Sequence, residues 1–468
     1  MGLLALVDFG STYTKVRLVD GEGRLMARAE APTTIETDLM EGYALALERA
    51  RAELSQPQAV ERVIAASSAG GGLRVAAIGL VADLTAAAAQ RAALNAGARV
   101  GTVLAGALGA GELAELDRAE PEIVLFAGGT DGGQRDLVLE NARRLATHGP
   151  DARVVVACNA AIADEVATIL GEAGIAAETA ANVMPALGRL QIDSAREAIL
   201  KIFLEHVIGG KGLSASPEFE AMVRMPTPEA VLRATRLLSR GPDGRGGIGG
   251  VIVVDVGGAT TDVHSDRALA PAGPGIEEPL LPTPLTLRTV EGDLGLRAGA
   301  PSVIEVDRRW LGEQIAEAGA GDMGRAAAER AGRPAWVPET GPESRLDRLL
   351  AIGCATHALD RHCGTMLLSR GGSGMPTLVR DGPDLREVRR VIGTGGVFAH
   401  GEDGEAILVE ALERRAPRAL SPRDAELGVD RGYVLAAAGL LATLDPAAAF
   451  RLMERELLRT RHSDQSGD

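Results

Sequence analysis

Cysteine, aromatic residues and long apolar runs are scarce in this sequence of 468 residues. The three cysteines, Cys158, Cys354 and Cys363, are too few and too scattered for a disulfide framework, and they favour a reducing compartment. Aromatic residues make up 2% of the chain, so the cores must be aliphatic and a surface for stacking nucleic-acid bases is not expected. Apolar runs such as residues 432–444 fall short of the ~20 residues of a membrane span.

Basic residues are also in deficit. Lysine and arginine number 49 against 64 aspartates and glutamates, which gives a net charge of −15. The sequence therefore lacks the basic footprint of a nucleic-acid-binding protein and the Lys/Arg clusters that hold proteins on anionic membranes. The N-terminal residues lead directly into an apolar strand, with no basic leader or cleavage site before it. We therefore expect a cytoplasmic protein with neither a nucleic-acid nor a membrane partner.

The N-terminal stretch, residues 3–20, reads as an apolar strand, a tight turn and a second strand. In and around the turn lie a carboxylate, a glycine, three hydroxyls and a lysine: Asp8, Gly10, Ser11, Thr12, Thr14 and Lys15. Glycine permits close approach of the backbone to a phosphate, and N–H and O–H groups supply donors. A carboxylate nearby suits a magnesium ion reached through its water shell. The same residue types form ordinary β-turns, so this stretch alone favours a plain hairpin.

A second stretch, residues 251–264, repeats this pattern after a glycine-rich linker at 241–250. An apolar strand again runs into an aspartate, glycines and a hydroxyl residue before a second strand: Asp255, Gly257, Gly258 and Thr260. Two copies of a strand–Asp–x–Gly hairpin are much harder to attribute to turn chemistry than one. They indicate two related lobes, each of which offers a phosphate-binding hairpin to a shared cleft.

A third glycine-rich turn follows a short apolar strand and consists of Gly393, Thr394, Gly395 and Gly396. A helix is predicted before it, over residues 349–367. The order of phosphate motif, phosphate motif, helix and glycine turn resembles that of the actin, Hsp70 and sugar-kinase superfamily, in which the last glycines contact adenosine. No Gly-x-x-x-x-Gly-Lys-Ser/Thr loop occurs, and this turn lacks the final glycine of a Gly-x-Gly-x-x-Gly fingerprint, which argues against the competing nucleotide folds.

The three motifs, with further stretches at 67–72, 128–133, 182–185 and 289–295, run through most of the chain. As a set and in this order they resemble the glutamate mutase accessory protein family (GlmL or MutL, unrelated to the mismatch-repair protein of that name). The resemblance implies an ATP-driven factor that reactivates an adenosylcobalamin-dependent carbon-skeleton mutase by releasing damaged cobalamin. ATP and Mg²⁺ would be its cofactors and the mutase subunits its partners, while the mutase would hold the cobalamin.

The resemblance also implies an α/β fold of the two-lobed actin-like ATPase type, in which RNase H-like domains are duplicated. Strand–loop–helix alternation from residue 120 onward indicates an additional parallel α/β subdomain. The expected divisions are a first lobe at 1–213 with the subdomain inserted at about 83–190, a connecting helix and linker at 214–250, a second lobe at 251–405, and C-terminal helices at 406–468 that return to the first lobe.

The two-lobe arrangement gives the acidic and basic motif residues distinct roles. Asp8 and Asp255 would hold Mg²⁺ through water, while the glycines and hydroxyls of the two hairpins would bind the phosphates. Asp255 and Glu291 are the candidates for positioning the attacking water, because phosphoryl transfer depends more on positioning and charge than on a strong base. Glu291 fits an ordinary acidic turn equally well. Lys15 either neutralises phosphate charge or is a solvated strand residue.

Three other functions stay open at this point, as does self-association. A small-molecule kinase of the same superfamily would need an acceptor pocket with an acid–base carboxylate beyond the two motif aspartates. A 2-hydroxyacyl-CoA dehydratase activator shares the Gly-Ser-Thr-x-Thr-Lys turn, but it passes an electron from an iron–sulfur cluster, and the cysteines here are unsuitably scattered. An actin-like scaffold would bind ATP with negligible turnover.

Overall fold

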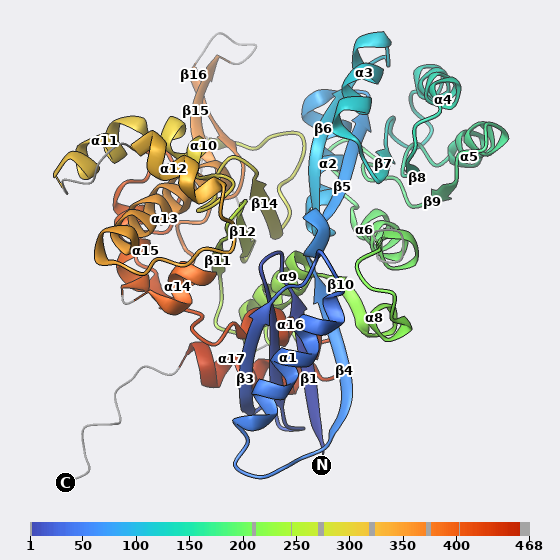
Figure 1. The fold of residues 1–468 in the computed structure, drawn as a ribbon. Helices are drawn as coiled ribbons and strands as arrows, with labels where there is room; N and C mark the ends of the chain where they lie inside the picture. The colour runs from blue at the N-terminus through green and yellow to red at the C-terminus, as the bar shows by residue number, and fades with distance from the viewer. Residues whose placement is uncertain are drawn as a thin grey trace.

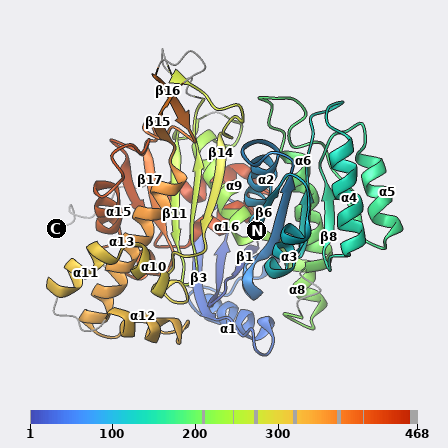
Figure 2. The ribbon, with the colours of Figure 1, turned by 90° about the horizontal axis from the view of Figure 1, so that it is seen from above.

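The computed structural model describes residues 2–207, 212–244, 246–269, 276–317, 323–370, 376–401 and 403–458. These residues form two lobes, each built on a five-stranded sheet, and a third body with a parallel sheet of its own. The predicted two-lobed α/β architecture is therefore confirmed. The first lobe lies at the bottom of Figure 1, and the second lobe (yellow to red) and the third body (teal) stand above it on opposite sides. Figure 2 shows the same arrangement from above.

The first lobe carries the N-terminal hairpin. Its sheet has the strand order β10-β4-β1-β2-β3, in which β1, β2 and β3 are antiparallel and β4 and β10 run parallel to β1. Strand β1 is buried on both faces, because its alternate apolar side chains enter two separate clusters. The elements of this lobe are β1 (Leu3–Phe9), β2 (Tyr13–Val19), β3 (Leu25–Pro32), α1 (Leu39–Ala52), β4 (Val60–Ser67), α8 (Pro217–Met222) and β10 (Val223–Pro226).

The second lobe repeats this sheet strand for strand. Its order is β14-β12-β11-β17-β18, in which β14, β12 and β11 are antiparallel and β17 and β18 run parallel to β11. This is the duplication expected of RNase H-like domains. The strands are β11 (Val251–Val256), β12 (Thr261–Asp266), β14 (Thr286–Glu291), β17 (Arg390–Thr394) and β18 (Glu426–Val429). Because β18 belongs to this sheet, the second lobe extends past the boundary expected at 405.

Helices cover one face of the second sheet, and a small sheet of order β13-β16-β15 projects beyond it (Figure 1). Helix α13 spans Gly341–His362, whereas the sequence predicted 349–367. The helix ends because the backbone of Cys363 is extended, with φ = −71° and ψ = 144°. The next residue, Gly364, packs closely against Gly382, whose carbonyl carbon would lie 2.6 Å from a Cβ at position 364. The other elements are β13 (Ile276–Glu277), α10 (Ala300–Val306), α11 (Arg308–Glu317), α12 (Met323–Ala331), β15 (Thr365–Arg370), β16 (Pro376–Asp381), α14 (Gly396–His400) and α15 (Gly404–Glu413).

The third body, the inserted subdomain, lies in the chain between β4 and β10. Its five strands are parallel, in the order β6-β5-β7-β8-β9. It begins at β5, ahead of the expected position 83, because β5 pairs with β6 and β7 rather than with the first sheet. Its elements are β5 (Leu73–Gly79), α2 (Ala87–Asn95), β6 (Ala98–Ala105), α3 (Ala110–Ala119), β7 (Ile123–Phe126), α4 (Asp136–His148), β8 (Arg153–Val156), α5 (Ala163–Glu172), β9 (Ala177–Thr179) and α6 (Asp193–Ile202).

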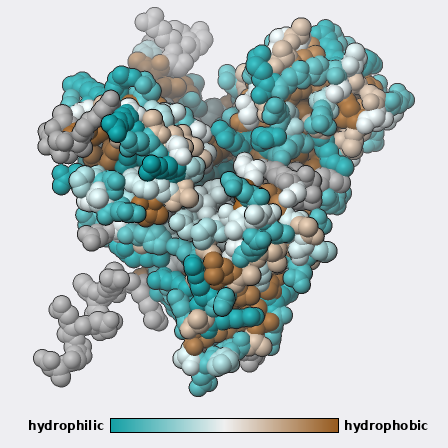
Figure 3. Space-filling model, viewed as in Figure 1, coloured by the Kyte–Doolittle hydropathy of each residue, from teal (hydrophilic) through white to brown (hydrophobic). Residues whose placement is uncertain are grey.

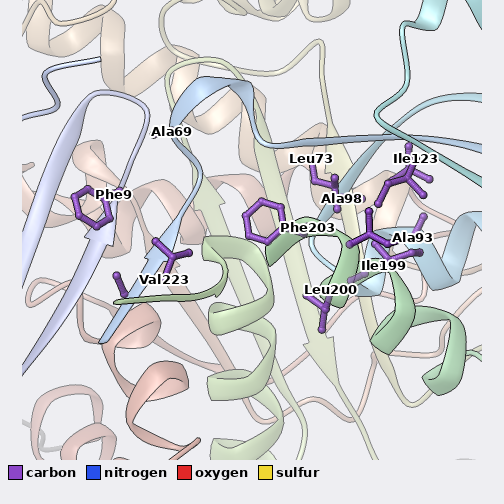
Figure 4. Packing of buried hydrophobic residues seen from close by; sticks show 14 of the residues in the cluster. Phe9, Ala69, Leu73, Ala93, Ala98, Ile123, Ile199, Leu200, Phe203 and Val223 are labelled. Carbon is purple, nitrogen blue, oxygen red and sulfur yellow. The ribbon is translucent and has the colours of Figure 1, made fainter. Parts of the chain in front are cut away.

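The inserted subdomain and the first lobe share one hydrophobic core. Figure 4 shows side chains of both bodies in a single cluster, with Phe9 and Val223 from the first lobe and Leu73, Ala98 and Ile199 from the subdomain. Each large aliphatic side chain in such a core stabilises the fold by about 1.5–3 kcal/mol when it is fully buried. The two bodies are therefore held together as one unit.

Two helices, α9 (Thr227–Arg240) and α16 (Val434–Leu441), lie between the lobes. With α17 (Pro446–Leu457) they bury side chains from both sheets, among them Leu6 of β1 and Val253 of β11. The end of the chain therefore packs on both lobes, although it was expected to return to the first. Across the described ranges, no helix combines the length and the apolar character needed to cross a bilayer.

Gly439→Ala should push α9 and α16 apart, because a Cβ at position 439 would lie 1.8 Å from the carbonyl oxygen of Ala230. We expect a loss of about 1–3 kcal/mol, the usual cost of overpacking a core, measured by urea unfolding followed by circular dichroism. Gly171→Ala is the matched control, since it lies in α5 where a new Cβ would meet no atom within 4 Å, and it should stabilise slightly. Unchanged stability of Gly439→Ala would contradict the close crossing of the two helices.

Candidate functional site

The turns of the two motif hairpins are built alike. In the first, the Gly10 N–H donates to the Tyr13 carbonyl over 3.2 Å, and in the second the Gly257 N–H donates to the Thr260 carbonyl over 2.9 Å. A Cβ at Gly10 would lie 2.7 Å from that Tyr13 oxygen, and one at Gly257 would lie 3.0 Å from the Thr260 oxygen. The two glycines therefore keep both turns tight, which leaves the backbone at each tip free to approach a ligand.

The motif aspartates occupy equivalent positions, each next to the last residue of the first strand of its lobe. Asp8 lies opposite Lys15 in the β1–β2 pair, and Asp255 lies opposite Asp262 in the β11–β12 pair. The Asp8 Oδ2 atom is 3.2 Å from Lys15 Nζ, and Asp8 Oδ1 accepts a hydrogen bond of 2.6 Å from the Thr227 hydroxyl. The two lobes thus differ at the cross-strand position, where one has a cation and the other a second carboxylate.

The charged groups of the two hairpins lie close enough to affect one another. Burial, and next the neighbouring charge of Asp262, raise the pKa of the Asp255 carboxyl to about 7. Two groups of the first lobe also act on this pKa: the carboxylate of Asp8 raises it, and the ammonium group of Lys15 lowers it. Since charges act strongly only over short distances, the Asp8 and Asp255 hairpins lie close to each other where the two lobes meet.

Tyr433 connects the first motif to the third. Its ring centroid lies 4.8 Å from Lys15 Nζ, and a Cβ at Gly396 would lie 3.6 Å from its hydroxyl. Burial raises the pKa of Tyr433, so its hydroxyl stays protonated. The Lys15 side chain is only 17% exposed and lies between Asp8 and this ring. Of the two sequence interpretations of Lys15, the solvated strand residue is therefore wrong.

The third motif lies directly beside Asp255. Gly395 has φ = +106°, and a Cβ there would lie 2.3 Å from the Val256 carbonyl oxygen and 3.2 Å from Asp255 Oδ1. Gly395 thus needs glycine for its conformation as well as for its close approach to β11. Gly393 lies inside β17, where a Cβ would meet the Phe398 ring at 2.5 Å, so this glycine serves packing within the lobe.

Two predicted binding hydroxyls are engaged inside the protein. Thr14 is fully buried on the opposite face of β2 from Lys15, as the alternation of side chains along a strand requires, and its hydroxyl lies 3.2 Å from that of Thr33. Thr394 pairs with Asp255 in the β11–β17 register and therefore lies on the same face of the sheet as that aspartate. It is buried, and its hydroxyl donates to Asp430 Oδ2 over 3.3 Å.

Glu291, the second candidate for positioning the attacking water, is paired with an arginine. Its carboxylate lies 2.7 Å from Arg361 Nη1, and Arg361 binds both carboxylate oxygens of Asp293 as well. Burial raises the pKa of Glu291, and the Arg361 guanidinium opposes this rise. The loop that follows Glu291 supports the second hairpin instead, since the Leu296 N–H donates to the Gly257 carbonyl over 3.0 Å.

Three residues at the site carry no motif signal: Thr227, Asp430 and Tyr433. Asp430 accepts hydrogen bonds from the Val434 and Leu435 N–H groups and thereby fixes the start of α16. Thr227 begins α9, and Tyr433 precedes α16 with φ = +48°. The helices between the lobes bring these three residues to the site from positions outside the motifs. Of the three, only Tyr433 could have been noticed in the sequence, because tyrosine is scarce there.

The strand order of the two sheets and the facing Asp–Gly hairpins place this chain in the actin-like ATPase and sugar-kinase fold class. The chain belongs to the MutL protein family, whose model matches residues 4–457. It is 41% identical over 463 residues to Protein MutL of Clostridium tetanomorphum, covering 98% of this chain and 100% of that protein. The family predicted from the sequence motifs is thus confirmed.

Solved structures resemble the chain more distantly. A nucleotide-free acetone carboxylase is 12% identical with a TM-score of 0.37, covering 94% of this chain and 70% of that one. A glycerol dehydratase reactivase is 12% identical with a TM-score of 0.35, covering 94% of this chain and 99% of that one. Because both TM-scores are low, the fold assignment rests on the strand order of the two sheets.

Asp255→Asn should stabilise the protein in the absence of ligands. Folding raises the pKa of the Asp255 carboxyl, so the folded protein holds its proton more tightly than the unfolded chain does. The folded state therefore loses stability as the pH rises from about 4 towards 7. We expect the melting temperature of Asp255→Asn to exceed that of wild type by roughly 2–4 °C at pH 8, with little difference at pH 5. Asp8→Asn, which loses the Lys15 ion pair, is the control and should not be stabilised. A difference in melting temperature between Asp255→Asn and wild type that does not change with pH would contradict the raised pKa of Asp255.

Proposed function

We propose that this protein is an ATP-dependent accessory factor that reactivates an adenosylcobalamin-dependent carbon-skeleton mutase. ATP binding and hydrolysis would be coupled to the release of damaged cobalamin from the mutase. The observation that carries the proposal is the pair of like-built Asp–Gly hairpins that face each other between two lobes, in a chain that belongs to the MutL family. The mutase is the partner implied by the sequence resemblance.

The triphosphate would lie between the two hairpin tips. Both tips offer backbone N–H groups and hydroxyls, the donors that phosphate oxygens require. The phosphate-binding residues are Gly10, Ser11 and Thr12 in the first lobe and Gly257, Gly258 and Thr260 in the second. Lys15 lies beside Asp8 and supplies a positive charge on the same side. Gly395 and Gly396, beside Asp255 and Tyr433, would contact the adenosine.

The acidic residues fit a magnesium ion held through water. Within the described ranges, no group of three or more His, Cys, Asp or Glu side chains could hold a metal directly. Asp8 and Asp255 could instead accept hydrogen bonds from its water shell, the mode that Mg²⁺ favours beside phosphates. The bound ion would neutralise phosphate charge. A nearby divalent charge would also keep Asp255 ionised, although its pKa is raised in the free protein.

Hydrolysis would depend on position more than on a strong base. Asp255 is the remaining candidate for orienting the attacking water, because Glu291 is paired with Arg361 and its loop holds the second hairpin. A ligand that contacts both hairpins favours the closed arrangement of the lobes, and loss of the γ-phosphate removes part of those contacts. Opening and closing of the lobes would thereby follow the state of the nucleotide.

The test is recovery of an inactivated mutase by the purified protein with ATP and Mg²⁺. Asp8→Ala and Asp255→Ala should each abolish recovery and lower ATP turnover by at least about 100-fold, the scale of lost electrostatic stabilisation at a reaction centre. Asp20→Asn, a carboxylate at the far end of β2, is the matched control and should behave as wild type. Normal recovery by both alanine variants would refute the nucleotide scheme. ATP turnover that requires a small-molecule acceptor and ignores the mutase would instead show a kinase.

A further inference from the structure

The turn between α2 and β6, residues 94–98, touches both lobes. On the side of the first lobe, Gly97 has φ = +83°, and a Cβ there would lie 3.1 Å from both the Glu229 nitrogen and Pro226 Cβ. These residues belong to the start of α9, whose first residue, Thr227, donates to Asp8. The turn therefore packs against the segment that holds the first motif aspartate.

On the side of the second lobe the same turn makes polar contacts to β14. The Asn95 amide donates to the Thr286 carbonyl over 3.0 Å and accepts from the Arg288 N–H over 3.0 Å. The Arg288 side chain donates through Nη1 to the carbonyls of Leu94 and Ala98, over 3.0 and 2.7 Å. Asn95 and Arg288 are 4% and 2% exposed, so these hydrogen bonds form away from water.

Arg288 also reaches the second hairpin. Its Nε and Nη2 atoms lie 2.7 and 2.5 Å from Asp262 Oδ1. Asp262 is the cross-strand partner of Asp255. One guanidinium thus joins the turn of the inserted subdomain to the residue beside Asp255. Asp262 also accepts a hydrogen bond of 3.3 Å from the Thr260 hydroxyl, which is the weaker of its contacts.

We propose that Asn95 and Arg288 form a polar latch that couples the inserted subdomain to the site between the lobes. The subdomain shares a large apolar core with the first lobe and so moves with it. Its junction with the second lobe has one apolar contribution to that core, Leu281, and the hydrogen bonds of the latch. Opening of the lobes about α9 and α16 would break the latch, and Arg288 would then release its hold on Asp262. Arg288 is a positioning residue in this scheme.

The latch gives the proposed function a route for regulation, and this inference rests on that function. Coupling between two sites is reciprocal, so a protein partner that displaces the inserted subdomain would alter nucleotide binding as strongly as the nucleotide alters partner binding. Figure 3 shows the surface hollowed between the second lobe and the inserted subdomain, which leaves both bodies reachable from that side.

Hydrogen–deuterium exchange of the full-length protein without nucleotide tests the latch directly. Asn95→Ala removes both amide contacts but leaves the Arg288–Asp262 pair. If the latch is coupled to the second hairpin, the rate of amide exchange in residues 251–266 should rise at least about fivefold. Asn95→Asp, which keeps the acceptor, should give a smaller rise and serves if the alanine variant does not fold. Arg91→Ala is the matched control, because Arg91 also joins α2 to the second lobe, at the Pro282 carbonyl, but outside the turn.

The same measurement with ATP and Mg²⁺ separates the latch from the proposed function. In wild type and Arg91→Ala, nucleotide should change exchange in residues 73–105, and in Asn95→Ala this change should be lost while calorimetry still detects ATP binding. Failure of wild type to bind ATP would refute the proposed function alone. Unchanged exchange of the 251–266 hairpin in both Asn95 variants would overturn the latch, whether or not ATP binds.

Discussion

The close crossing of α9 and α16 is the constraint on which the site depends. Together with α17 the two helices bury side chains from both sheets, and Gly439 allows a very close approach of the α16 backbone to that of α9. Both helices begin at the site: Thr227 opens α9 and binds Asp8, while Asp430 and Tyr433 precede α16. The crossing therefore holds the two lobes next to each other and positions the side chains that line the space between them.

Without a ligand, the site carries more negative than positive charge. Three carboxylates lie close together there: Asp8, Asp255 and Asp262. Lys15 is paired with Asp8, and Arg288 is paired with Asp262. Among the residues that the structure describes, none forms an ion pair with Asp255, and burial and the neighbouring carboxylates raise its pKa. Natural proteins accept such local costs where function needs them. The imbalance suits a site that receives a cation together with a polyanion, as the proposed function requires.

The mechanical layout follows from where apolar and polar contacts lie. Aliphatic side chains join the first lobe to the inserted subdomain and both lobes to the central helices, and such cores are packed like solids. Between the inserted subdomain and the second lobe, by contrast, one buried leucine, Leu281, joins the shared core, and the contacts to β14 include the hydrogen bonds of Asn95 and Arg288. Hydrogen bonds exchange with water at little net cost, so this junction is the part of the assembly best suited to open and close.

The sequence by itself determined the duplicated hairpins, because strand periodicity and the Asp–x–Gly turn are local properties that each lobe shows independently. It also determined the family, since many short motifs recur in a fixed order. Tertiary structure alone decided which motif residues reach the site. Thr14 turns inward by strand alternation, the Thr394 hydroxyl binds Asp430, Glu291 pairs with Arg361, and Arg288 links Asp262 to a turn far away in sequence. Such pairings depend on distances between elements that no local pattern records, because they arise only when separate sheets pack together.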